Sequence, residues 1–273
     1  MYITNRPEVA QIAEQAGVDR IWIDLEYIGK ADRQGGMDTV KNHHTAEDVR
    51  TIAACLKTSE VLVRVNPVHD ALPDYFSTED EVNAVIKNGA QVVMLPYFKT
   101  PIEVERFIRA VDGRSKTQLL LETPEAVDHL DEILGIEGID EIHIGLNDLS
   151  LGYHKKFMFE LLADGTVERI MGQIHDAGIP CGFGGVSRPG SGVLPADYIL
   201  GEHVFYGSQA VILSRSFCNT ALISDPAEVG RIFQTGVAAI RHAEEECRHW
   251  TQEQFCQNHQ MVVESVKQIL QGM

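Results

Sequence analysis

Residues Leu119–Ala126 read LLLETPEA, and residues Ile142–Ser150 read IHIGLNDLS. Each stretch is a short apolar run that delivers one carboxylate, Glu122 in the first and Asp148 in the second. Such runs are typical of buried parallel strands, and in an α/β barrel the side chain at the strand end lies at the mouth. Carboxylate oxygens suit a hard divalent cation. The two acids together therefore predict a barrel with a metal site at its mouth.

Either acid alone has a simpler interpretation. Glu122 directly precedes the helix start Thr123-Pro124-Glu125, so it could cap that helix. Asp148 could cap a following helix in the same way. The presence of two such acids favours the metal site.

Along the chain, short apolar runs alternate with longer amphipathic stretches, which is the pattern of repeated β-α units. An open doubly wound sheet would show the same alternation. Eight runs favour a closed TIM (β/α)8 barrel. The predicted strands are Tyr2–Thr4, Arg20–Leu25, Val61–Val65, Val92–Pro96, Gln118–Glu122, Glu141–Gly145, Pro180–Gly184 and Gln209–Ser214.

The amphipathic stretches predict helices, several of which end just before a glycine. After Phe217 the pattern is purely helical, and it is longer than the single helix that follows the last strand of a barrel. We predict a single TIM-barrel domain over 1–273, with 225–273 as a C-terminal helical extension outside the barrel or at a subunit interface. The predicted helices are Pro7–Ala16, Ala46–Leu56, Glu79–Asn88, Ile102–Val111, Pro124–Leu134, Val167–Ala177, Pro226–Cys247 and Thr251–Gln271.

Composition limits the partners. The chain has 273 residues, of which 44% are apolar, enough for one barrel core. The net charge of −17, from 40 acids against 23 bases, argues against a nucleic acid or an anionic membrane as partner. Five cysteines without metal-type pair spacing predict neither a disulfide framework nor a zinc site. No signal-peptide pattern opens the chain, so we expect a cytoplasmic location.

The motifs ETPEAV and GIDEIHIGLNDLS resemble those of the HpcH/HpaI aldolase and citrate lyase family, which read ETxEAx and then GxDxxxIGxxDLS. The resemblance runs from about Met1 to about Phe217. It implies a metal-dependent enzyme of the pyruvate and phosphoenolpyruvate TIM-barrel group, with Glu122 and Asp148 as ligands of Mg²⁺ or Mn²⁺, or of Co²⁺. The implied substrate-binding residues of the second motif are Gly145, Leu146 and Asn147.

The second predicted strand, IWIDLEY, ends in Asp24 and Glu26, which project to the same side of the strand. The corresponding motif of the family is D-x-E-H, in which the His is the general base and is supported by the Asp. Tyr27 stands where that His is expected. The chain departs from the family here, and the base has to come from elsewhere.

A loop over 28–41 follows and leads into NHHT. His44 lies five residues before Val49, the distance at which the family's His precedes its own helix. We therefore favour His44 over His43 as the base, supported by Asp24. A His near its ordinary pKa suits proton transfer at neutral pH. The alternative is a solvated helix start capped by Thr45.

Arg64 lies inside the apolar run VLVRVNP, where a charge needs a partner. One interpretation is a structural ion pair with Asp24 or Glu26. The other, which the family's equivalent Arg supports, is a fork of donors for a substrate carboxylate and for the enolate oxygen.

The loops after the seventh and eighth strands are the usual anion site of a TIM barrel. Here they read CGFGGVSRPGSG and ILSRSF. Arg188 and Arg215 bring positive charge, so a phosphate or a second carboxylate could bind, with hydrogen bonds from Gly184, Gly185 or Ser187. Ordinary turns are the alternative.

The sequence and the resemblance together predict a metal-dependent carbon–carbon lyase, an aldolase acting on a 2-oxo acid through a pyruvate enolate and an aldehyde. The catalytic residues would be His44, Arg64 and Asp24. The alternatives are an acyl-CoA lyase of the citrate lyase type, a phosphoenolpyruvate-type enzyme, and a non-catalytic metabolite-binding barrel. The resemblance also implies a homo-oligomer, a hexamer or a trimer.

Overall fold

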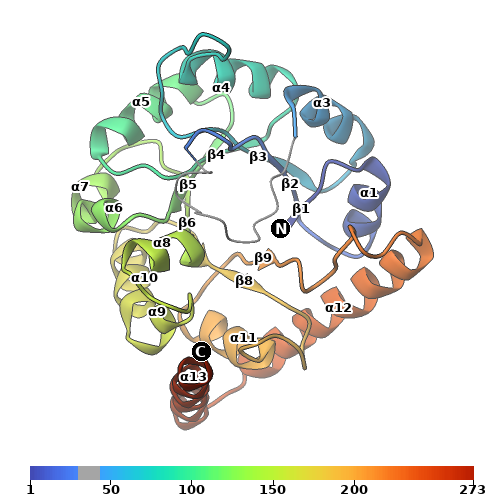
Figure 1. Ribbon diagram of the computed structural model, residues 1–273, viewed down its shortest axis with the longest axis vertical. Coiled ribbons are helices and arrows are strands. Elements are labelled where there is room, and N and C mark those ends of the chain that lie inside the picture. The colour runs from blue at the N-terminus through green and yellow to red at the C-terminus, as the bar shows by residue number, and fades with distance from the viewer. Residues whose placement is uncertain (30–43) are drawn as a thin grey trace.

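The computed structural model describes residues 1–29 and 44–273. Seven parallel strands form one curled sheet in chain order, around which the helices are arranged (Figure 1). A separate sheet of two strands, β8 (Gly185–Val186) and β9 (Ile212–Leu213), lies between the two ends of the curled sheet. The seven strands are β1 (Tyr2–Ile3), β2 (Arg20–Asp24), β3 (Glu60–Arg64), β4 (Val92–Leu95), β5 (Lys116–Leu121), β6 (Glu141–Ile144) and β7 (Cys181–Phe183).

The prediction of a fully closed eight-stranded barrel was wrong. The predicted strand Pro180–Gly184 ends at Phe183, because Gly184 has φ +50°, outside the region that strands adopt. The main-chain hydrogen bond from Leu213 N to Met1 O, 2.8 Å, links β9 to the start of the chain without extending the ladder. The fold is therefore a TIM-like α/β fold with a seam at β8 and β9. The doubly wound alternative is also wrong, since the strand order never reverses.

Helices cover the outside of the sheet (Figure 1). The predicted helix Pro124–Leu134 is interrupted at His129, and three helices that the sequence did not predict are α8, α9 and α11. The helices are α1 (Pro7–Gln15), α3 (Ala46–Cys55), α4 (Thr78–Lys87), α5 (Pro101–Val111), α6 (Pro124–Asp128), α7 (Leu130–Leu134), α8 (Leu146–Gly152), α9 (Glu160–Ala163), α10 (Thr166–Asp176), α11 (Ala196–Phe205), α12 (Pro226–Cys247) and α13 (Gln252–Gly272).

Side chains inside the sheet lie in layers, because every second residue of a strand points inward. At the amino ends of the strands, Arg20 binds Glu60 (Nε to Oε2, 2.8 Å) and Glu141 (Nη2 to Oε1, 2.6 Å). The next layer is largely apolar, although the buried His143, the register partner of Leu120, also belongs to it. This layer separates the charged layer from the carboxyl ends, where the charged side chains described below lie. It contains Trp22, Leu62, Val92, Met94 and Leu120.

The C-terminal extension packs on the same chain. Helix α12 lies against α1 and α11, and α13 lies against α11 and α9 (Figure 1). The buried carboxylate of Glu202 on α11 receives hydrogen bonds from Asn258 (2.9 Å) and contacts His259 Nδ1 (3.0 Å), both on α13. In the described part of the chain, no helix combines the length and the hydropathy that crossing a bilayer requires.

Candidate functional site

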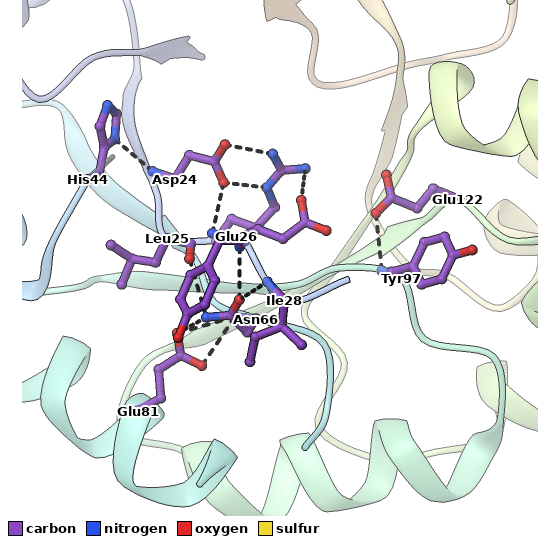
Figure 2. Close-up of polar contacts among 11 residues, drawn as sticks. Asp24, Leu25, Glu26, Ile28, His44, Asn66, Glu81, Tyr97 and Glu122 are labelled. Carbon is purple, nitrogen blue, oxygen red and sulfur yellow. Dashed lines mark hydrogen bonds and ion pairs between the residues drawn. The ribbon is translucent and has the colours of Figure 1, made fainter. Parts of the chain in front are cut away.

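A buried ion cluster lies at the carboxyl ends of β2 and β3, whose last residues, Asp24 and Arg64, are register partners. Arg64 donates from Nε and Nη2 to the two carboxylate oxygens of Asp24, each at 2.8 Å (Figure 2). Its Nη1 lies 3.1 Å from Glu26 Oε2. Its guanidinium also lies 5.0 Å above the Trp22 ring, so the apolar layer forms the floor of the cluster.

The cluster keeps Arg64 charged. Burial acts to lower the pKa of Arg64, but the charges of Asp24 and Glu26 outweigh it, and the pKa is raised. The prediction of a structural ion pair is therefore confirmed. The two hydrogen bonds to Asp24 use two of the five N–H donors of the guanidinium, and the contact with Glu26 is an ion pair, so donor capacity remains for a ligand.

Glu122 and Asp148 line one pocket of about 350 Å³, together with Tyr97 and Thr123. Glu122 follows β5 and is 3% exposed, whereas Asp148 is half-buried in the first turn of α8. Neither acid is an N-cap. Thr123 caps α6 by accepting a hydrogen bond from Ala126 N at 3.2 Å, and Gly145 occupies the cap position of α8. Both helix-cap interpretations were therefore wrong, and the acids are brought together instead.

The donor set of this pocket fits a hard divalent cation. A Cβ on Gly145 would lie 2.7 Å from Glu122 Oε2, so the glycine leaves space beside that oxygen. Mg²⁺ is commonly held by one or two protein carboxylates, with water and substrate completing the shell. Residues 1–29 and 44–273 hold no cluster of three or more His, Cys, Asp or Glu that would bind a metal. The pair thus suits Mg²⁺ or Mn²⁺ better than a closed zinc site.

Tyr97 contributes a main-chain donor that the sequence did not predict. Its N–H donates to Glu122 Oε1 at 3.1 Å (Figure 2). Tyr97 has φ +49°, a left-handed conformation that costs a non-glycine residue about 1–3 kcal/mol. This strained turn after β4 therefore orients a predicted metal ligand.

His44 directly precedes the cap of α3, and its Nδ1 accepts a hydrogen bond from Asp24 N at 3.0 Å (Figure 2). Support from Asp24 thus comes through the main chain, while its carboxylate binds Arg64. A ring nitrogen that accepts from an amide carries no proton, so in a neutral ring Nε2 carries it. His44 lies at the opposite end of the cluster from Glu122 in Figure 2. His43 lies outside the described residues.

The alternative at this position is also borne out in part. Thr45 caps α3, forming a capping box with Asp48. Tyr27, which replaces the family's His, is half-exposed, and its ring meets Tyr75 edge-on at 5.1 Å. Burial raises the pKa of Tyr27, so its phenol is protonated at neutral pH.

The other predicted substrate residues are dispersed. Leu146 is buried in the core, and Asn147 is exposed. Arg188 and Arg215 are exposed and line a separate pocket of about 600 Å³ beside α12. The predicted metal ligands Glu122 and Asp148 line a different pocket. The structure therefore groups the two arginines with each other and not with Glu122.

Two polar residues that the sequence analysis missed are Asn66 and Glu81, which are 0% and 2% exposed. They hydrogen-bond to each other, and Asn66 also hydrogen-bonds to the turn after β2 (Figure 2). One signal was available. Glu81 occupies the helical stripe of α4 that also buries Thr78, Val82 and Val85, and a carboxylate on a core-facing stripe needs partners.

In enzymes with a TIM-like fold the active site lies at the carboxyl ends of the strands, and the charged side chains described above lie at that end. Residues 2–182 match the HpcH/HpaI aldolase/citrate lyase family, and the chain belongs to that family. A comparison with curated proteins gives no match.

Solved structures share the fold. The HpcH/HpaI aldolase from Desulfitobacterium hafniense DCB-2 aligns with a TM-score of 0.60 and 17% identity, over 78% of this chain and 84% of that one. A family protein from Burkholderia cenocepacia J2315 gives 0.58 and 17%, over 91% and 94%. Citrate synthase SbnG gives 0.56 and 17%, over 90% and 93%.

Proposed function

We propose that this chain is a divalent-metal-dependent carbon–carbon lyase of the aldolase type, which forms or cleaves a 2-oxo acid from pyruvate and an aldehyde. One observation carries the proposal. Glu122 and Asp148, far apart in sequence, line the same pocket at the carboxyl ends of the strands. Membership of an aldolase and citrate lyase family supports the reaction class.

In this proposal, Glu122 and Asp148 hold Mg²⁺, Mn²⁺ or Co²⁺. A bound divalent cation supplies Lewis acidity toward the carboxylate and keto oxygens of the 2-oxo acid. Arg64 offers its remaining N–H groups to the oxygen on which negative charge develops, while Asp24 and Glu26 keep the guanidinium plane fixed.

Bond formation begins when a base removes a methyl proton of pyruvate and the electron pair of that C–H bond moves toward the keto group. The resulting carbon nucleophile attacks the aldehyde carbon, and the new alkoxide takes a proton. Cleavage is the reverse. His44 is the proposed proton carrier. Because its Nδ1 accepts from Asp24 N, taking a proton at Nε2 requires the ring to release that 3.0 Å contact.

The test follows the methyl protons of pyruvate by NMR in deuterated buffer, with Mg²⁺ or Mn²⁺ supplied and, in parallel, with a chelator. Metal-dependent exchange supports the proposal. A protein without exchange, in which metal binding is verified separately, is not an aldolase, which leaves an acyl-CoA lyase, a phosphoenolpyruvate-type enzyme or a metabolite-binding barrel. Assays with an aldehyde and with coenzyme A thioesters separate the aldolase from an acyl-CoA lyase.

We predict that His44→Ala lowers the rate of proton exchange by about 10²-fold, the usual lower reach of general acid–base catalysis. His43→Ala and Tyr27→Phe should each change the rate far less. The measurement is the exchange rate of the three purified variants under saturating metal. If Tyr27 proves essential while both histidines are dispensable, the base is a phenol or a water.

The assembly remains a separate proposal. We expect a homo-oligomer, with α12 and α13 contributing contacts between subunits. Sedimentation at micromolar concentration measures the mass directly. A monomer under those conditions would contradict this expectation without bearing on the chemistry.

A further inference from the structure

The buried amide of Asn66 binds the turn that follows β2. Its Oδ1 accepts hydrogen bonds from the N–H groups of Tyr27 and Ile28, each at 2.9 Å (Figure 2). Its Nδ2 donates to the main-chain oxygen of Leu25 at 3.2 Å. One side chain therefore fixes the turn on both sides of Glu26.

The carboxylate of Glu81 in turn fixes the amide. It accepts from Asn66 Nδ2 at 2.8 Å, from Asn66 N at 3.2 Å and from the Tyr75 hydroxyl at 2.9 Å. An ionised carboxylate only accepts hydrogen bonds, so it holds the NH2 of Asn66 toward itself and the amide oxygen toward the turn. Replacing this carboxylate by an amide removes that directionality.

A carboxylate in this position is costly for the fold. Glu81 is almost fully buried, and burial raises its pKa. An apolar residue on the same stripe of α4 would serve core packing without that cost. Charged residues at core-facing positions, where an apolar residue is expected, tend to lie at functional sites.

The turn leads directly to the charged cluster. Glu26, held between the Asn66 contacts, pairs with Arg64 at 3.1 Å, and Arg64 is two residues before Asn66 on the same strand end. We infer that Asn66 and Glu81 are positioning residues of the proposed lyase, which set the place of Glu26 and through it the orientation of Arg64. This inference rests on the proposed function.

The test compares two Glu→Gln variants on α4 in the full-length protein loaded with Mn²⁺. Glu81→Gln is expected to lower kcat for pyruvate proton exchange by about 10- to 100-fold per folded molecule, because small displacements of a site cost rates of that order. KM for pyruvate should change by less than about threefold, since Glu81 contacts neither the predicted metal ligands nor Arg64 in the described contacts. Glu79→Gln, which removes the exposed partner of Arg106, should leave kcat unchanged.

An unchanged kcat in folded Glu81→Gln overturns the inference. If that variant does not fold, Tyr75→Phe removes one donor to Glu81 and should lower kcat about threefold, with an unchanged kcat again overturning it. The double variant Asn66→Asp with Glu81→Gln exchanges the acid and the amide, and should exceed Asn66→Asp alone in kcat. If kcat of the double variant does not exceed that of Asn66→Asp, the hydrogen bond between residues 66 and 81 does not set the rate, and the inference is overturned. No exchange in the unmodified protein overturns the proposed function, and this inference with it.

Discussion

Glu122→Ala is expected to abolish metal-dependent turnover, with proton exchange falling by about 10³-fold or more. The reason is that the variant would lose the bound metal, which supplies several kcal/mol of charge stabilisation. The fold should persist, since Glu122 lies above the apolar layer and not in it. Asp148→Ala should behave in the same way. The measurements are Mn²⁺ affinity, proton exchange and the thermal midpoint of each variant.

Glu125→Gln is the matched control, because Glu125 lines the same pocket but pairs with Lys99 at 2.8 Å on the surface. We expect it to keep both Mn²⁺ affinity and exchange. Full activity in Glu122→Ala or in Asp148→Ala would place the metal elsewhere.

Arg64→Met should have the largest effect on stability. It removes the guanidinium that pairs with the buried carboxylates of Asp24 and Glu26, and removing one partner of a buried ion pair costs about 3–5 kcal/mol of the free energy of unfolding. Exchange should also be lost. Urea unfolding gives the stability at each pH.

The pH dependence of this variant has a definite sign. Removing the positive charge of Arg64 makes protonation of the two buried carboxylates easier in the folded state, so the native variant binds more protons than the native unmodified protein. The deficit in stability relative to the unmodified protein then grows as the pH rises and shrinks toward acidic pH. Adding Asp24→Asn and Glu26→Gln to Arg64→Met should recover stability without recovering exchange. A deficit independent of pH would show that lost packing, not charge, is the cause.

Most of the fold could be predicted from the sequence, because apolar period and helix-start signals are local. The strand over Arg20–Asp24 and the helix Pro226–Cys247 were placed within a residue. The seam was missed because it depends on the left-handed φ of Gly184, which the apolar pattern of the segment does not reveal. A glycine in a strand pattern gives only a weak hint of such a break.

The candidate site also has features that local sequence predicts and features that depend on contacts between distant segments. The need of Arg64 for an acid partner followed from a charge within an apolar run, and the structure supplies both predicted partners. The core-facing stripe of α4 could have indicated that Glu81 needs a buried partner, but that Asn66 is this partner could not be predicted, because neither residue specifies the other across the sequence. Tyr97 was missed for a related reason. Its contribution is a main-chain N–H aimed by an unusual φ, which its side chain does not reveal.

The apolar layer inside the sheet has a practical consequence for protein engineering. It separates the Arg20–Glu60–Glu141 cluster at the amino ends of the strands from the Asp24–Arg64–Glu26 cluster at the carboxyl ends. Charges at the two ends thus belong to different tasks, one to holding the strands in register and the other to the proposed chemistry. The amino end can be redesigned for heat tolerance, for instance by optimising its ion pairs, while the proposed site at the opposite end is left unchanged.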